Sequence, residues 1–303
     1  MAVNAALVTG ASGFVGAALC AALRSHGWVV QASSLRLLEN PGAWRDSLGS
    51  IGCVVHLAAH VHQMQNAGVD ADYRRINVDG SRLLAKQAAE AGVRRFVFLS
   101  SVKVNGEGAE HPYKATDRPQ PQDAYGRSKL EAEQVIREIC SGSGMECVVI
   151  RPPLVYGPGV KANFRRLLRL VELGIPLPLA SIENRRSLVG LGNLVDFIET
   201  CMCHPRAPEQ TWFVADDEVV STPKLLRRIA THMNRPLRLM NFPPHWLPKL
   251  ARLVNRRAEV DRLCESLQVD VTASKAVLDW RAKITLDEEL ALTVAAYREE
   301  RAR

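Results

Sequence analysis

The feature that most limits the possible folds of this chain is a glycine-rich turn close to its N-terminus. The segment "AALVTG" (5–10) predicts an apolar strand, and "VGAALCAALRSHG" (15–27) predicts the helix that follows it. Gly10, Gly13 and Gly16 are spaced through the turn between the two. Glycine lets the backbone approach a phosphate closely, and the helix N-terminus supplies free N–H groups and a favourable dipole. A strand, turn and helix in this order predict that the turn binds the pyrophosphate of a dinucleotide.

The same order of strand and helix continues through the first half of the chain. Short apolar runs bounded by glycines or prolines alternate with segments of helical period. We expect further strands at 28–34, 53–59, 95–101 and 146–153, and further helices at 77–92, which opens with a capping residue, and at 125–140. This alternation predicts an α/β fold, a doubly wound parallel sheet of the Rossmann type with helices on both faces.

The pattern changes in the second half of the chain. Prolines cluster at 176–178 and 243–248, helical segments dominate, and the apolar runs become shorter. We therefore expect a dinucleotide-binding domain over residues 1–156 and a smaller, mostly helical C-terminal lobe for the substrate over 157–303. One apolar segment of the second half, 186–201, is expected to return to the first domain.

Composition and charge exclude several classes of protein. The 303 residues carry a net charge of +7, but no run of lysine and arginine alternates with aromatic residues, so no nucleic-acid partner is expected. No apolar run reaches the roughly 20 residues needed to cross a bilayer, so no membrane insertion is expected. The N-terminus lacks the basic region of a signal peptide and enters an apolar strand directly, which predicts a cytoplasmic protein.

The seven cysteines are scattered and odd in number, which indicates reduced thiols rather than a disulfide framework. Cys201, Cys203 and His204 lie close together in "CMCH", yet no second pair of ligands follows at the spacing of a zinc site. We therefore expect no metal site.

The end of the second expected strand bears on the choice of dinucleotide. An acidic residue about 20 positions after the glycines binds the ribose 2′-hydroxyl of NAD. Here Ser33 and Ser34 end the strand, Arg36 follows, and the first acid is Glu39. Hydroxyls and a cation suit a 2′-phosphate, so NADP(H) is favoured as the cofactor. NAD(H) stays open, because Arg36 could equally be a solvated loop residue.

A tyrosine and a lysine stand one helical turn apart in "YGRSK". Tyr125 and Lys129 therefore share one face of the helix expected at 125–140. A phenol with its ordinary pKa of about 10 is a poor acid–base catalyst at neutral pH. A neighbouring ammonium and a nicotinamide cation would both favour the phenolate and lower the pKa of Tyr125. Lys129 could in addition hold the ribose of the cofactor.

In their order along the chain, these motifs resemble one family. The chain is similar to the extended short-chain dehydrogenase/reductases, and within them to the nucleotide-sugar epimerase/dehydratase branch. The similarity extends over nearly the whole sequence through TGASGFVG, HLAA (56–59), NVDG, LSSVKVNGE, YGRSK, RPPLVYGPGVKANF (151–164) and RRSLVGLGNLVD (185–196). It implies an enzyme that binds a nicotinamide dinucleotide and a UDP-sugar. It also implies a homodimer, formed through the helices at 77–92 and 125–140.

The resemblance assigns roles to individual residues. Ser101 would hydrogen-bond the reacting sugar oxygen, Tyr125 would exchange the proton, and Lys129 would orient cofactor and tyrosine. Asn163 and Arg186 match positions that contact the sugar-diphosphate part of the substrate. Arginine also suits phosphate by its bidentate geometry, although Arg186 could be a surface cation. The residues implied to bind the cofactor are Gly10, Ser12, Gly13, Phe14, Val15, Gly16, Arg36, Leu57, Ala58, Ala59, Asn77, Tyr125, Lys129, Pro152 and Val155.

The residues after Ser101 separate this chain from one group of relatives. In family members that dehydrate a 4-keto sugar, an acidic pair follows the active-site serine or threonine, whereas Val102 and Lys103 stand there in this chain. Valine cannot carry a proton, so the resemblance excludes that dehydration. Lys103 has two interpretations, a substrate-binding cation or a loop residue that points to solvent.

Two reactions remain, and both use the same serine, tyrosine and lysine. The stretches "SSVKVNGE" and "RPPLVYGPGVKANF" most resemble a subgroup that reduces UDP-4-keto-6-deoxy-N-acetylglucosamine at C4 with NAD(P)H. Those relatives make precursors of bacterial surface polysaccharides such as O-antigen. The alternative is a UDP-sugar 4-epimerase that retains NAD. A non-catalytic dinucleotide-binding sensor is a further alternative, disfavoured because the catalytic set is complete.

Overall fold

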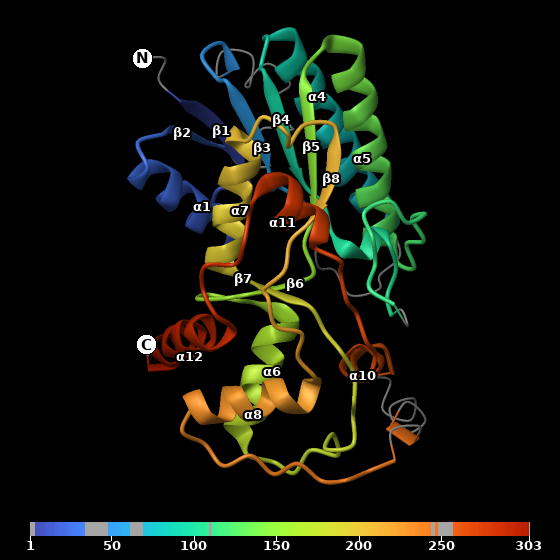
Figure 1. Cartoon of the computed structure of the whole chain (residues 1–303), viewed down its shortest axis with the longest axis vertical. Coiled ribbons are helices and arrows are strands. Elements are labelled where there is room, and N and C mark those ends of the chain that lie inside the picture. Colours follow the sequence, from blue (N-terminus) through green and yellow to red (C-terminus); the bar gives the residue numbers. More distant parts are fainter. Residues whose placement is uncertain are drawn as a thin grey trace.

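The computed structural model describes residues 4–33, 48–60, 69–108, 111–243, 246–247 and 257–302. It has a sheet-containing domain at one end and a smaller lobe, built mainly of helices, at the other (Figure 1). Within this described part, the main sheet has six parallel strands in the order β2-β1-β3-β4-β5-β8. These strands are β1 (Ala5–Thr9), β2 (Val29–Ser33), β3 (Cys53–His56), β4 (Arg95–Leu99), β5 (Glu146–Arg151) and β8 (Gln210–Phe213).

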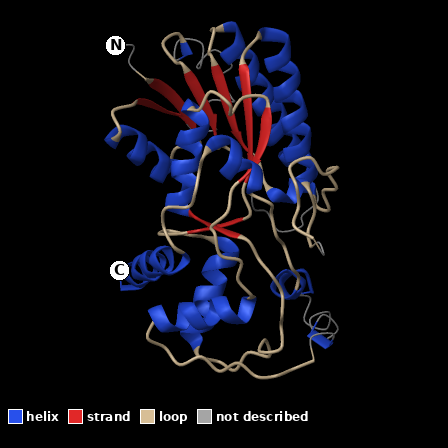
Figure 2. Cartoon of the chain, viewed as in Figure 1, coloured by secondary structure: helices blue, strands red, loops and turns tan. Residues whose placement is uncertain are grey.

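Helices cover both faces of this sheet (Figure 1; Figure 2). α1 (Phe14–Ser25) and α7 (Leu191–Cys203) lie on one face, and α4 (Gly80–Glu90) and α5 (Ala124–Ser143) lie on the other. Their apolar side chains pack against the strands in two separate cores. The doubly wound parallel sheet expected from the sequence is therefore confirmed.

The central strands are buried on both faces, which explains why their sequences are mostly apolar. Every residue of β3 is buried, as are the first four residues of β4. A strand between two helical layers needs apolar side chains in both directions, so its sequence does not alternate between polar and apolar.

One buried charge at the start of β4 explains the "CMCH" segment. Arg95 is 1% exposed, and its Nη1 atom donates to the carbonyl oxygens of Cys201, Met202 and His204 at 2.9, 2.8 and 3.1 Å. These carbonyls lie at the end of α7, where the helix dipole favours a cation. The carboxylate of Glu146 lies 2.6 Å from Arg95 Nε. The segment is thus a helix terminus held by an arginine.

The lobe has its own core and a small sheet. Its elements are β6 (Leu154–Tyr156), β7 (Leu188–Gly190), α6 (Ala162–Leu173), α8 (Thr222–His232), α10 (Arg257–Cys264) and α12 (Leu286–Ala302). The two strands pair in parallel. The apolar faces of α6, α8 and α12 pack together with residues of both strands in one core.

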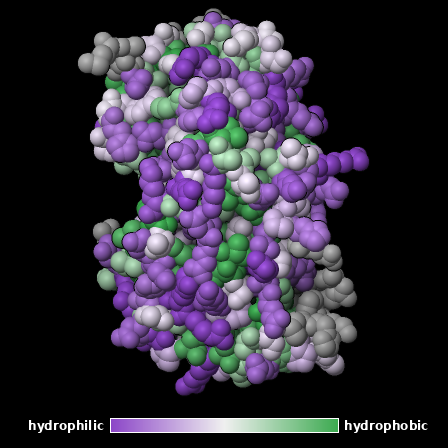
Figure 3. Space-filling model, in the orientation of Figure 1, coloured by the Kyte–Doolittle hydropathy of each residue, from purple (hydrophilic) through white to green (hydrophobic). Residues whose placement is uncertain are grey.

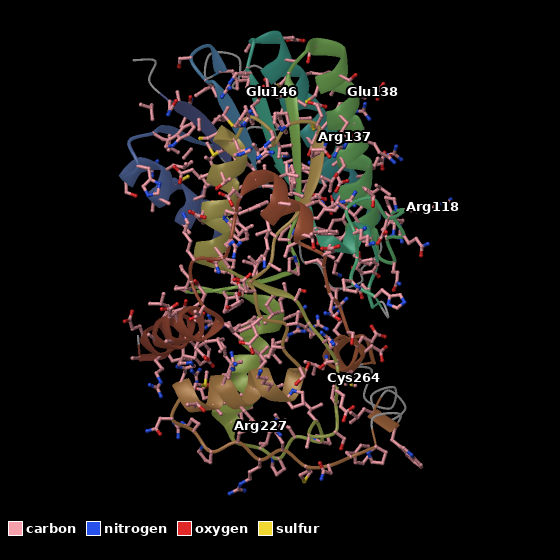
Figure 4. All side chains as sticks on the ribbon, viewed as in Figure 1. Arg118, Arg137, Glu138, Glu146, Arg227 and Cys264 are labelled. Atoms are coloured by element: carbon pink, nitrogen blue, oxygen red, sulfur yellow. The ribbon has the colours of Figure 1, made fainter. Side chains whose placement is uncertain are left out.

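The chain passes between the two parts more than once. The expected returning segment, 186–201, comprises β7 and most of α7, and α7 packs against α1. β8 then joins the sheet next to β5, where Arg137 of α5 (Figure 4) donates from Nη2 to Thr211 Oγ1 at 2.6 Å. α11 (Thr272–Leu278) packs against β8. The sheet domain therefore takes elements from well beyond residue 201.

The surface of the described residues is mixed in character. Hydrophilic side chains cover most of the face seen in Figure 3, with apolar ones gathered between the two halves and near the far end of the lobe. No helix in these ranges is both long and apolar enough to cross a membrane. Within the same ranges, no three His, Cys, Asp or Glu side chains are grouped so that they could hold a metal ion.

Candidate active site

The glycine turn places bare backbone at the ends of β1 and β2. Gly10 has a φ of +69°, and its N–H donates to the carbonyl oxygen of Ser33 at 3.0 Å. A Cβ at Gly16 would lie 2.1 Å from the carbonyl oxygen of Gly10, so only glycine allows α1 to begin this close to the turn. Gly13 precedes α1 without a side-chain cap, and the first turn of the helix carries no acid. A helix N-terminus without a nearby negative charge suits a phosphate.

The other residues expected to bind the cofactor follow the ends of the strands. In the structure these are Ser12, Phe14 and Val15 after β1, Leu57, Ala58 and Ala59 after β3, and Pro152 and Val155 after β5. Ligands of doubly wound sheets bind at this C-terminal edge. Arg36, expected to select NADP(H), lies outside the described residues, as does Ser34. Contacts between this set and a dinucleotide stay a prediction.

Asn77 holds two segments together. Residues Arg74–Asp79 form a π-helix that leads directly into α4, so the capped helix start expected at residue 77 is wrong. The buried side chain of Asn77 accepts from the N–H of His60 at 2.7 Å and donates to the carbonyl of His60 at 3.2 Å. It also donates to Ser128 Oγ at 3.0 Å. Asn77 therefore ties the segment after β3 to α5, and its contact with the cofactor stays a prediction.

α5 carries the tyrosine and lysine predicted to catalyse the reaction. Asp123 caps this helix, because its Oδ1 atom accepts from the N–H of Gly126 at 2.7 Å. The cap fixes the first turn, which contains Tyr125. The ring centroid of Tyr125 lies 6.1 Å from that of Tyr73, which comes from α3 (Val69–Tyr73). Two helices thereby set the position of the phenol.

Lys129 is a buried amine that has no hydrogen-bond partner within the described part of the chain. Its side chain is 1% exposed, and its Nζ atom lies 4.1 Å from the centroid of the Phe98 ring. Burial lowers the pKa of Lys129 to about 7, while the carboxylate of Glu133 acts in the opposite direction. A buried polar group without partners lacks the hydrogen bonds that it would make in water. This amine is therefore suited to donate hydrogen bonds to the hydroxyl oxygens of a ligand.

The surroundings of Tyr125 keep its phenol protonated. Burial raises the pKa of Tyr125 above its ordinary value, and the carboxylate of Asp123 and the nearby Tyr73 raise it further. The lowering expected from a neighbouring ammonium is therefore outweighed within the protein itself. In this state the phenol is a proton donor.

A buried charge network supports the loop that carries Ser101. Arg151 of β5 pairs with Glu133 of α5, with Nη2–Oε2 at 2.5 Å and Nε–Oε1 at 2.9 Å. Glu133 also accepts from Ser100 Oγ, and Arg151 Nη1 donates to Asn105 Oδ1 at 3.0 Å. One ion pair thus fixes the loop on both sides of Ser101.

Sequence reasoning missed this network. Glu133 follows Lys129 by one helical turn on the face that meets the sheet, and Arg151 is a charge in an otherwise apolar strand. Because a charge is rarely buried without a partner, these two signals together could have predicted an ion pair behind the site.

Ser101 and Lys103 belong to the short segment that follows β4. Ser101 Oγ accepts from the N–H of Lys103 at 3.3 Å, at the start of the 3₁₀ helix Val102–Val104. The ammonium of Lys103 pairs with Asp123 and, at 2.5 Å, with Glu107. It is therefore engaged within the protein rather than directed only to solvent, and its contact with substrate stays a prediction.

The residues expected to meet the diphosphate of the substrate lie in the lobe. Arg186 Nη1 donates to the carbonyl oxygens of Arg262 and Glu265 at 2.6 and 2.9 Å, which places the guanidinium against the end of α10. Burial lowers the pKa of Arg186, opposed by the carboxylates of Glu265 and Glu107. Asn163 is half-buried in the first turn of α6. Arg186 thus helps to hold the lobe together, and phosphate contacts of both residues stay predictions.

Several known proteins are similar to this chain in sequence or in structure. A family model described as "NAD dependent epimerase/dehydratase family" matches residues 6–215. A UDP-glucose 4-epimerase from Vibrio cholerae is 40% identical, over 96% of this chain and 94% of the relative. A UDP-glucose 4-epimerase from Thermotoga maritima, solved with UDP-glucose, has a TM-score of 0.79 at 20% identity, covering 98% of this chain and 99% of that one. MoeE5, solved in complex with UDP-glucose and NAD, has a TM-score of 0.79 at 25% identity, over 98% of this chain and 99% of that one.

Proposed function

The chain belongs to the NAD dependent epimerase/dehydratase family, and from that premise we propose that it catalyses hydride transfer at C4 of a nucleotide-linked sugar. The observation that carries the proposal is Lys129, which lies one helical turn from Tyr125 and whose buried Nζ atom has no hydrogen-bond partner among the described residues. Such an amine gains the hydrogen bonds that it lacks when a ligand supplies acceptors. Ser101 completes the set from the end of the neighbouring strand β4.

The residues present fit a nicotinamide dinucleotide. No Cβ can be added at Gly10 or Gly16 without a clash, so backbone N–H groups can meet a pyrophosphate, and Lys129 would bond a ribose. When bound, the dinucleotide would supply or accept the hydride. The preference for NADP(H) expected from Arg36 is kept as a proposal, with NAD(H) as the alternative that the ligand of MoeE5 supports.

Each catalytic side chain has a part that follows from its chemistry. The hydroxyl of Ser101 would hydrogen-bond the oxygen at C4 of the sugar. Tyr125 would donate a proton to that oxygen or accept one from it, and Lys129 would stabilise the phenolate when it forms. The side chain of Val102 has no group that can transfer a proton, so the acid–base pair needed to dehydrate the sugar is not present after Ser101.

Reduction of a 4-keto sugar is the first candidate. A carbonyl that accepts hydride must also receive a proton, and burial together with Asp123 keeps Tyr125 in the protonated form that can donate it. The substrate class proposed is a UDP-linked 4-keto-6-deoxy-N-acetylhexosamine, from the resemblance of "SSVKVNGE" to reductases of such sugars. Asn163 and Arg186 would contact its sugar-diphosphate part.

The second candidate is 4-epimerisation of a UDP-sugar with NAD retained. The name of the Vibrio cholerae relative supports it directly. Epimerisation begins with removal of a proton from the C4 hydroxyl, so Tyr125 would have to act first as a base. The raised pKa of Tyr125 opposes that step unless added positive charge lowers it.

Two expectations about the setting are also kept as proposals. The enzyme would act in the cytoplasm on precursors of surface polysaccharides. It would act as a homodimer through α4 and α5, which pack side by side on one face of the sheet (Figure 1). Sedimentation of the purified protein tests the second proposal.

One assay separates the two reactions. The purified protein is given UDP-4-keto-6-deoxy-N-acetylglucosamine with NADPH or NADH, and loss of the reduced nicotinamide is followed by absorbance. Oxidation that disappears in Tyr125→Phe supports the reductase, and the faster cofactor decides the Arg36 question. No oxidation, together with exchange at C4 of UDP-hexoses and NAD released on denaturation, supports the epimerase. Absence of both activities contradicts the proposed function.

A further inference from the structure

Lys103 connects the Ser101 loop to the helix that carries Tyr125. Its backbone N–H donates to Ser101 Oγ at 3.3 Å, while its ammonium pairs with Asp123, the N-cap of α5. Asp123 binds Lys103 through Oδ2 and accepts from the N–H of Gly126 through Oδ1. One lysine therefore contacts both the serine and the cap of the tyrosine helix.

The backbone of Lys103 packs against the same helix. A Cβ at Gly126 would lie 2.7 Å from the carbonyl oxygen of Lys103 and 3.0 Å from Cβ of Pro121. Glycine at this position allows the loop to approach the first turn of α5, which accounts for the residue after Tyr125 in "YGRSK". The loop and the helix thus meet twice, once through backbone and once through charge.

The ammonium of Lys103 also extends toward the lobe. Its Nζ atom lies 2.5 Å from Glu107 Oε1, and Glu107 Oε2 lies 3.7 Å from Arg262 Nε on α10. The carbonyl oxygen of Arg262 accepts from Arg186. Cys264 marks this end of α10 in Figure 4. Carboxylates and cations therefore alternate from the catalytic helix to the lobe, with Lys103 between them.

The charge on Asp123 is placed to affect the phenol. Among the described residues, the titratable groups around the phenol are Asp123 at its own helix terminus, Tyr73 from α3 with His60 against it, and Lys129 one turn along α5. Burial acts to raise the pKa of Asp123, but hydrogen bonds from Lys103 and from the backbone bring it below its ordinary value. Asp123 is therefore ionised, and its charge is offset mainly by Lys103, with a smaller contribution from Arg262.

We propose that Lys103 is a positioning residue, which keeps Ser101 and Tyr125 in one arrangement and neutralises the carboxylate beside the phenol. The proposal rests on the proposed function, because it gives the proton transfer to Tyr125. Lys103 touches no reacting atom in this scheme. Its place after the serine is explained by Asp123 and Glu107, which it bridges.

The test compares single and double variants. Lys103→Met removes the cation, whereas Asp123→Asn removes the charge but keeps the helix cap, because an asparagine oxygen also accepts from the backbone N–H. We expect Lys103→Met to move the titration of Tyr125 up by about one pH unit and to lower the kcat at pH 7 about tenfold. Asp123→Asn should move the titration down, and the double variant should return it close to that of the original protein. Lys103→Arg should restore most of the kcat.

Two readouts keep the proposal separate from the proposed function. The first is the pH profile of kcat with the sugar that is turned over. The second needs no sugar: with the oxidised dinucleotide bound, whose nicotinamide cation would lower the pKa of Tyr125, the ultraviolet absorbance of phenolate is titrated as the difference between each protein and its Tyr125→Phe counterpart. Lys224→Met is the matched control. It breaks the pair between Lys224 of α8 and the carboxylate of Glu218, which lie 2.7 Å apart, and should leave both readouts unchanged.

The outcomes divide clearly. An unchanged phenolate titration in Lys103→Met, or shifts in the same direction for Lys103→Met and Asp123→Asn, overturns the proposal. Lack of turnover by the original protein overturns the proposed function alone, since the absorbance titration still reports on Lys103. If circular dichroism shows that Lys103→Met is unfolded, Asp123→Asn and Lys103→Arg decide. A downward shift of the Tyr125 titration in Asp123→Asn, with no shift in Lys103→Arg, supports the proposal. Any other result contradicts it.

Discussion

The two sides of the candidate site are built from opposite materials. At the turn between β1 and α1, Gly10 and Gly16 expose backbone, and no acid lies in the first turn of the helix. Between β4 and α5 the site consists of charges and hydroxyls, several of them held by another group, as Asp123 holds Lys103. On the first side a ligand could approach the backbone because glycine has no side chain. The second side depends on contacts between side chains from segments that are distant in the sequence.

This difference predicts how each side responds to substitution. A site made of backbone tolerates no added atom but depends little on charge or pH. A site made of buried charges depends on every partner, because removal of one leaves the other without compensation. Four changes, taken from the largest expected loss to the smallest, test this contrast.

The largest effect is expected for Tyr125→Phe on the charged side. Loss of the proton donor should lower kcat by about 10²–10⁴-fold. The ring that contacts Tyr73 is kept, so the affinity for the dinucleotide, measured by fluorescence titration, should stay within about twofold of the original, the equivalent of about 0.5 kcal/mol. Substantial turnover in this variant would show that another group transfers the proton.

Glu133→Ala should cause the largest loss of stability. It leaves Arg151 buried without its carboxylate, and such a change lowers the free energy of unfolding by about 3–5 kcal/mol. Urea denaturation measures the loss. The control is Glu218→Ala, which breaks a surface pair with Arg228 and should lower the free energy of unfolding by about 0–1 kcal/mol. Equal losses in the two variants would contradict the contrast.

The contrast also explains how far the sequence could be read. The turn at Gly10 and the alternation of strands and helices lie within short windows, so local patterns predicted them. The pair Lys103–Asp123 and the pair Arg151–Glu133 join residues that are 20 and 18 positions apart, and no periodicity connects such partners. They become visible only when β4, β5 and α5 are placed side by side.

The position of β8 and the role of Asn77 were also not predicted, because both depend on tertiary contacts. β8 is four residues long and lies far from the strands it joins, so nothing local marks it as the sixth strand of the described sheet. Asn77 was predicted to open a helix, because asparagine is a common N-cap. Instead its side chain bonds His60 and Ser128, and the π-helix around it places it there. Tertiary contacts outweighed the local preference in both cases.

On the backbone side, Gly16→Ala is expected to have an intermediate effect. The added Cβ would lie 2.1 Å from the Gly10 carbonyl, and overpacking of this kind costs about 1–3 kcal/mol of stability. Calorimetric titration should show at least about tenfold weaker binding of NADPH, the equivalent of about 1.4 kcal/mol. Gly142→Ala, in α5 with no atom within 4 Å of the new Cβ, is the matched control and should be slightly stabilising. Unaltered NADPH binding in Gly16→Ala would mean that the turn has another use.

The smallest loss is expected for Lys129→Met, which should stabilise the fold by an amount that depends on pH. The pKa of Lys129 is about 7 in the folded protein, against about 10.4 in the unfolded chain. Below pH 7 the amine is charged in both states and burial of the charge destabilises the fold. Between the two pKa values the unfolded chain binds more protons, so stability rises with pH.

Below pH 7 the methionine variant should therefore have a higher melting temperature than the original protein. The increase should be about 2–4 °C for each kcal/mol of destabilisation that the buried charge causes. The difference should vanish as the pH approaches 10. Thermal denaturation between pH 6 and 10, without cofactor, measures it. Lys86→Met, an exposed position on α4, supplies the control and should give no pH-dependent difference. A gap that stays constant with pH would show that Lys129 is not buried as a neutral amine.

The place of β8 at the end of the main sheet has a consequence for synthesis of the protein. β5 pairs with β4 on one side and with β8 on the other, yet Gln210–Phe213 leave the ribosome only after β6, α6, β7 and α7. Until then the apolar β5 is an open edge, a form prone to pairing with other chains. A nascent chain stalled before residue 210 should therefore depend on a chaperone, whereas one stalled after β8 should not.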